Sequence, residues 1–158
     1  MVLRRGRRKA VCARVARQAL LRGRSTLPLA GTRHVSPSEL FAEIVKVSPS
    51  FDAVVAEHTA DHGTLLPHLL MGDLVRYVGA HFVPAAQQTV APSSRGEVAA
   101  ILKVLDAGLA STDLDTQNVI AVSFVEDIES HEFYKPLARL FGLRLRSEHK
   151  RQLACRAR

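Results

Sequence analysis

Residues 57–82, EHTADHGTLLPHLLMGDLVRYVGAHF, surround a leucine-rich run with four of the chain's seven histidines. At 100° per residue, the apolar side chains of residues 70–82 gather on one arc, which predicts an amphipathic helix packed on a core. Gly63 is suited to end the preceding helix, and Thr64 to cap the next one. Pro67 is tolerated in the first turn of that helix, where backbone N–H groups lack intrahelical partners. This stretch therefore predicts two helices joined by a short turn.

Further helix signals lie on both sides of this stretch. Ser36 and Glu39 form a capping box with a proline between them, and Ser94 and Glu97 form a second box. Asp113 is a suitable cap for the element that follows it. The predicted helices are residues 37–47, 49–62, 65–82, 95–109, 114–130 and 131–141, with a long connection at 83–96 and Gly142 as the final stop.

The segment VIAVSFV, residues 119–125, is compatible with either a buried strand or a helix, because it is rich in β-branched residues. A helix is favoured, since the polar residues around it fit one long element and no second strand is available for pairing. The predicted fold class is therefore all-α: a compact bundle of about six helices over residues 36–142. HEAT-type hairpin packing is compatible with this pattern.

The composition is that of a globular protein, with 47% apolar and 23% charged residues in a chain of 158. One domain is expected at this length. No apolar run approaches the roughly 18 residues that a membrane-spanning helix needs. Cys12 and Cys155 form no C-x-x-C motif, which favours a reducing, cytoplasmic protein.

The net charge of +7 is distributed unevenly. Residues 1–34 carry ten Lys and Arg and no acid, residues 35–143 carry six basic and fourteen acidic residues, and residues 144–158 carry six basic residues and one acid. This predicts an acidic helical domain at 35–143 between a basic, disordered extension and a basic C-terminal tail.

The basic extension, residues 1–34, is compatible with several roles. Arginines interrupt every candidate apolar region of a secretory signal. An organellar transit peptide, an arm that contacts nucleic acid or a membrane, and a disordered extension without a dedicated role all remain open, and the last is favoured. An upstream start codon chosen in error, with the true start near Val35, is one version of it.

The histidines raise the question of a metal site. His58 and His62 are four residues apart on one helix face, a spacing that binds metals in H-E-x-x-H enzymes, but Thr59 replaces the glutamate that acts as base there. Asp61 and His68 are candidate third ligands for a divalent metal. The favoured interpretation is that His58, His62 and His81 are core or interface residues. A metal site and acid–base catalysis are the alternatives.

Two sequence blocks resemble a known family. LLPHLLMGDLVRYV (65–78) and TQNVIAVSFVEDI (116–128) resemble the LLPH-x-x-MGD and QN-x-IAVSF-x-E blocks of small bacterial proteins without an assigned function. The resemblance covers residues 40 to 135 and implies a compact helical domain without established chemistry. By analogy of class alone, small orphan domains of this kind include immunity partners of secreted toxins.

Two main hypotheses of function follow. The favoured one is a binding module, not an enzyme and without a cofactor, whose acidic face engages another protein, such as a basic toxin or nuclease. The predicted face consists of Glu126, Asp127, Glu129 and Glu132. The alternative is a small metal-dependent enzyme built on His58 and His62. A third reading gives the basic flanks a nucleic-acid role.

Overall fold

A computed structural model describes residues 33–86 and 92–156, and all regular secondary structure in them is helical, which confirms the predicted all-α class. The elements are α2 (Pro37–Val47), the 3-10 turn η1 (Pro49–Phe51), α3 (Asp52–His62), α4 (Pro67–Ala86), α5 (Pro92–Gly108), α6 (Leu114–Asn118), the π-helical η2 (Val119–Val125), α7 (Glu126–Ile128), α8 (Tyr134–Ala138) and α9 (Leu143–Arg156). The predicted basic extension lies outside the described residues, except for Arg33 and His34.

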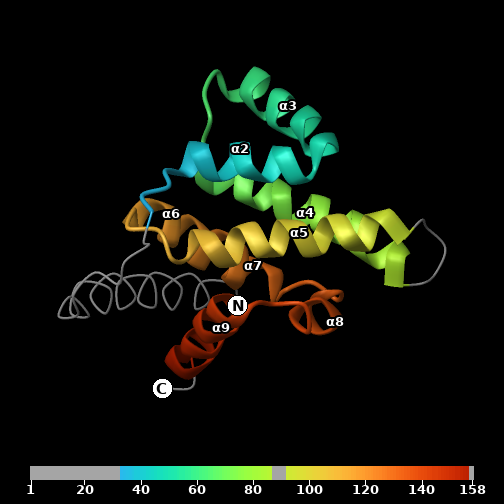
Figure 1. The fold of residues 1–158 in the computed structure, drawn as a ribbon, viewed down its shortest axis with the longest axis vertical. Helices are drawn as coiled ribbons and strands as arrows, with labels where there is room; N and C mark the ends of the chain where they lie inside the picture. The colour runs from blue at the N-terminus through green and yellow to red at the C-terminus, as the bar shows by residue number, and fades with distance from the viewer. Residues whose placement is uncertain (1–32, 87–91, 157–158) are drawn as a thin grey trace, which may run out of the picture.

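The core forms where α4 packs against η2 and α5, and where α2 covers α5. The buried apolar core includes Phe41, Leu74, Leu105 and Phe124 from these elements and Phe141 from the segment before α9, and α3 adds only the partly buried Val54 and Val55. Helix α3 lies at one end of the long axis of the molecule, and α9 lies at the other end (Figure 1).

Helix α2 begins as predicted. The Ser36 side chain accepts from the backbone N–H of Glu39, and the Glu39 carboxylate accepts from the backbone N–H of Ser36 at 2.7 Å. This reciprocal pair satisfies two N–H groups that otherwise lack helical partners.

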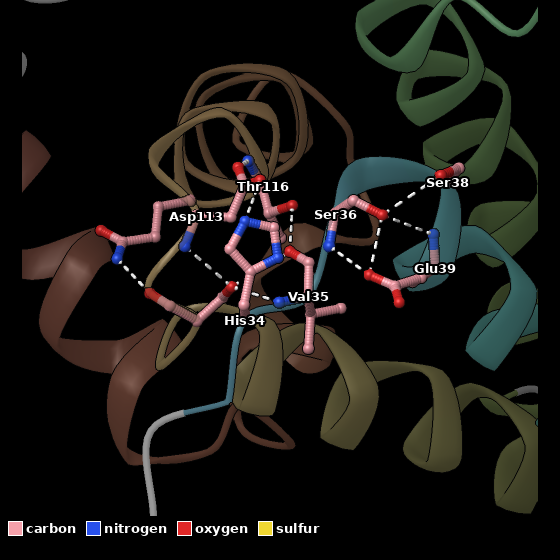
Figure 2. A network of polar contacts seen from close by, with 9 residues as sticks. His34, Val35, Ser36, Ser38, Glu39, Asp113 and Thr116 are labelled. Carbon is pink, nitrogen blue, oxygen red and sulfur yellow. Dashed lines mark hydrogen bonds and ion pairs between the residues drawn. The ribbon is translucent and has the colours of Figure 1, made fainter.

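The segment before α2 is tied to the corner between α5 and α6 (Figure 2). The backbone N–H of Val35 donates to Ser111 Oγ at 2.9 Å, and Thr116 Oγ1 donates to the Val35 carbonyl at 2.7 Å. Next to these contacts, His34 lies 3.3 Å from Asp113, which caps α6 as predicted by accepting from the N–H of Thr116. Polar contacts over about 80 residues of sequence therefore hold the start of the domain.

The predicted helix 49–62 is divided in two, with η1 turning the chain before α3 begins at Asp52. Gly63 ends α3 as predicted, in a left-handed conformation with φ of 69°. Thr64 does not cap the next helix, because α4 starts only at Pro67. His58 takes part of that role by accepting the Leu66 N–H.

The predicted connection at 83–96 is too long. Helix α4 continues to Ala86 and α5 begins at Pro92, so Ser94 lies within a helix and does not cap it. Glu97 bonds to other side chains instead, which are described below. The core face of α5 consists of Val98, Ile101, Leu102 and Leu105, which are buried.

The segment 119–125 is helical, as favoured, but it is a π-helix within the continuous helical run from α6 to α7. π-Helical turns leave the regular hydrogen-bonding ladder. Here the side-chain amide of Gln152 donates to the carbonyl of Ala121 at 2.6 Å. The segment is therefore held from outside by α9.

The helices of the C-terminal region differ from the prediction in two respects. The predicted helix 131–141 is reduced to α8, and residues 143–156, where no helix was predicted, form α9. Helix α9 buries Leu145 and Gln152 against the domain, and the carboxylate of Asp106 on α5 accepts the Leu145 N–H at 2.9 Å. A side chain from another helix therefore caps α9, and no sequence motif near residue 143 predicts where this helix starts.

Candidate functional site

The four candidate metal ligands do not meet at one point. His58 is buried, whereas Asp61, His62 and His68 are exposed. In the described ranges 33–86 and 92–156, no group of three or more His, Cys, Asp or Glu side chains is placed to hold a metal ion.

His58 is a structural histidine, as the favoured reading predicted. Its Nδ1 lies 3.0 Å from the carboxylate of Asp73, and its Nε2 lies 3.2 Å from the backbone nitrogen of Leu66. A backbone N–H can only donate, so Nε2 must accept and Nδ1 must carry the proton that is donated to Asp73. Both ring nitrogens are thus used within the protein, and Arg76 pairs with the same carboxylate.

His62 was expected as a core or interface residue; it is exposed, so its placement in the core was wrong. Its ring contacts the ring of His58 edge to face, with 4.6 Å between centroids. His62 lies on the same face as His58, but it is the last residue of α3, where Gly63 and Thr64 after it are exposed as well. His81 is half-buried, stacks on Tyr77 and donates through Nδ1 to the Tyr77 carbonyl.

One nucleophile–base contact was missed, because its members are 55 residues apart. His68 Nδ1 lies 2.7 Å from Ser123 Oγ, which joins the first turn of α4 to the π-helical segment η2. A serine–histidine pair of this kind is the core of nucleophilic catalysis when a third group orients the base. Among the described residues, no side chain forms a hydrogen bond with the other ring nitrogen of His68, so the pair lacks a group that orients the base.

A cluster of hydroxyl groups surrounds Glu97 between η1, α4 and α5. Its Oε1 accepts from Ser48 at 2.5 Å, from Tyr77 at 2.9 Å and from Ser50 at 3.0 Å. Burial disfavours the charge, but these hydrogen bonds and the positive charge of His81 outweigh it, so the pKa of Glu97 lies below its usual value. Burial raises the pKa of the Tyr77 phenol. Every hydroxyl of the cluster has a partner, and the cluster joins three elements of the fold.

The predicted acidic face at 126–132 is largely engaged by α9. Arg156 pairs with both Glu126 and Glu129, and His149 Nε2 lies 2.9 Å from Glu129 Oε1. The side chains of both glutamates are 13% exposed. Asp127 and Glu132 stay nearer to solvent, and Asp127 lies 3.8 Å from His131.

Tyr134 extends this contact between α7, α8 and α9. Its hydroxyl bonds to the imidazole of His149, and its pKa is raised, first by burial and then by the negative charge of Glu129. The basic tail predicted at 144–158 thus has a structural role in residues 143–156: it neutralises carboxylates of the domain.

Helix α3 carries three exposed carboxylates. Asp52, Glu57 and Asp61 are exposed, and none has a hydrogen-bond or ion-pair partner among the residues that the structure describes. Only His58 of the eleven residues of α3 is buried. Asp115 and Glu132 are exposed without such partners as well, but they lie singly, so α3 is where carboxylates without internal partners gather, a location that the density of acids in the sequence did not indicate.

A family model described as "Domain of unknown function (DUF7674)" matches residues 41–154. The expected likeness to a family without an assigned function is thus confirmed at that level, and the match also takes in most of α9. No curated protein and no solved structure matches the chain. No helix in the described part of the chain is long and apolar enough to cross a membrane.

Proposed function

The chain belongs to the DUF7674 family, and we propose that it is a protein-binding module in which the exposed face of α3 engages a cationic surface of a partner protein. The observation that carries this proposal is the exposure of α3, an eleven-residue helix with one buried side chain, two partly buried valines and three carboxylates without partners among the described residues. Unpaired charge on one surface steers an oppositely charged partner toward it.

The side chains on this face of α3 are suited to contact with a partner protein. Its exposed members are Ala53, Ala56, Glu57, Ala60 and Asp61, which fall within an arc of about 140° at 100° per residue. Alanines permit a close approach, and the two carboxylates, four residues apart, fit a pair of lysines or arginines. A basic toxin held by an immunity protein is one partner of this type. The proposal replaces Glu126 and Glu129, which are paired with α9, as the centre of the acidic face.

Site-specific photo-crosslinking in the source cells tests the proposal. A crosslinking amino acid in place of Ala56 on α3 is expected to capture a protein, whereas the same amino acid in place of the exposed Thr112, at the distant α5–α6 corner, is not. The double substitution Glu57→Lys/Asp61→Lys should abolish the capture, since it reverses the charge without touching a buried residue. Capture from position 112 and not from 56 would sink this placement of the binding face.

A further inference from the structure

A second helix face lacks a partner, on α9 at the opposite end of the molecule. Its members are Leu143, Arg146, Ser147, Lys150, Leu153 and Ala154, all exposed and within about 120° of the helix circumference. Leu143 and Leu153 are 79% and 47% exposed, which is high for leucine. Neither Arg146 nor Lys150 has a carboxylate partner among the described residues; Arg146 reaches only the carbonyl of Arg139, at 3.5 Å.

The faces on α3 and α9 are complementary in charge, and leucines on α9 are matched by small side chains on α3. Arg146 and Lys150 are four residues apart, as are Glu57 and Asp61, so both pairs span about 6 Å on one side of a helix. The leucines of α9 flank its cations, and the alanines of α3 leave room beside its carboxylates. Two such helices can pack with each cation opposite a carboxylate and each leucine against small side chains.

We infer that the α9 face of one molecule docks on the α3 face of a second copy of this chain. The inference rests on the proposed function, because it names a partner for the same α3 face. The two faces lie at opposite ends of the long axis, so a molecule cannot join its own faces (Figure 1). A contact between different faces is heterologous, and it yields open chains of molecules or rings.

The α9 face fits a protein better than a nucleic acid or a membrane. Two cations without carboxylate partners provide little of the phosphate neutralisation that supports nucleic-acid binding, and the face has no aromatic side chain for stacking on bases. Two leucines bury little apolar area in a bilayer. Both helices are short, so the contact is smaller than the roughly 800 Å² per partner of a standard interface, and we expect weak, salt-sensitive association.

Sedimentation velocity of the full chain, at rising concentration in low and in high salt, tests the inference. The expected result is a sedimentation coefficient that rises with concentration in low salt and returns to the monomer value in high salt. Glu57→Lys/Asp61→Lys and Arg146→Glu/Lys150→Glu should each give monomers alone, because like charges then meet. An equal mixture of the two variants restores opposite charges at each contact and should associate again.

A matched control separates this contact from the overall charge. Asp115→Lys/Glu132→Lys changes the net charge by the same amount as the α3 variant, at exposed positions outside both faces, and should leave association unchanged. A wild-type chain that stays monomeric at every concentration in low salt overturns the inference. Self-association that survives in Arg146→Glu/Lys150→Glu also overturns it. The inference fails as well if the wild-type chain does not self-associate but binds duplex DNA or anionic vesicles, and Arg146→Glu/Lys150→Glu loses that binding.

The proposed function is judged separately. The α9 variant leaves the α3 face intact, so capture of a different protein from position 56 should persist in it. If a different protein is still captured from position 56 but the wild-type chain does not self-associate, only the second copy is excluded as the partner. If the chain self-associates and no other protein is captured from position 56, a different partner protein is excluded and the contact between copies is supported.

Discussion

The Nδ1 atom of His58 lies 3.0 Å from the carboxylate of Asp73, and this bond joins α3 to α4. His58 is the one buried residue of α3, and this helix is otherwise held by Val54 and Val55, which pack on the core while only partly buried, so it has fewer buried contacts than the other long helices. Helices held by few buried contacts open at a lower free energy than the core. Helix α3 is therefore the part of the domain best suited to adapt to a partner.

Replacing His58 with alanine should detach α3 from α4. The substitution leaves the Leu66 N–H without its acceptor and removes the bond to Asp73, for a cost of about 1–3 kcal/mol in the free energy of unfolding or of local opening. Hydrogen exchange should become faster in α3 and stay slow in α5. His62→Ala is the control, since that side chain is exposed, and equal protection of α3 in the wild type and in His58→Ala would contradict the anchor.

Acid should destabilise the domain through Glu97. The folded-state pKa of Glu97 lies below its ordinary value near 4.5, so its contribution to stability is complete above that value and is lost as the pH falls through the folded-state pKa. Glu97→Gln should lower stability at neutral pH and flatten its decline in acid. Denaturant unfolding of both proteins between neutral pH and pH 3 measures this, and parallel curves would exclude the effect.

Alkali should destabilise the same cluster through Tyr77. Burial raises the folded-state pKa of this phenol above 10.0, so the stability it contributes is complete below the unfolded-state value and is lost as the pH rises through the folded-state value. Tyr77→Phe cannot ionise and should keep more of its neutral-pH stability above pH 10. Thermal melts of the two proteins across that range give the comparison, and an identical alkaline decline would count against it.

Gly142→Ala should disturb the start of α9. An added Cβ would overlap the Asp106 carboxylate, so Asp106 must rotate and release the Leu145 N–H that it caps. The expected loss is about 1–2 kcal/mol in the free energy of unfolding, as for the removal of a helix cap. Gly96→Ala on α5 is the matched control, because its Cβ meets no atom within 4 Å and alanine favours helix. Denaturant unfolding should give opposite signs for the two variants.

Local chemistry allowed much of the fold to be predicted. The capping box at Ser36, the cap at Asp113 and the stop at Gly63 depend only on residues close in sequence, and all three were correct. Helix α9 was missed for the opposite reason: it has few apolar residues, and its cap, Asp106, is 39 residues before the N–H that it accepts. The start of α5 was misplaced because Glu97 was read with Ser94.

The candidate site was harder to predict, since charge density does not reveal pairing. The acids of residues 126–132 are the densest in the chain, but Arg156, 27 residues beyond Glu129, engages two of them. The acids of α3 are fewer, and they lack partners because α3 lies at the end of the molecule (Figure 1). Periodicity likewise predicted burial of both His58 and His62, but the fold buries only the first.

The π-helical segment η2 makes the domain sensitive to the length of its chain. It places residues five apart on one side, so Val119 and Phe124, like Ile120 and Val125, are both buried. Deleting one residue here would convert the segment to a regular α-helix and rotate everything after it by about 100°. Ile128 would leave the core and Glu129 would turn away from Arg156, so length variation between Asp113 and Ile128 should be selected against more strongly than any conservative substitution there.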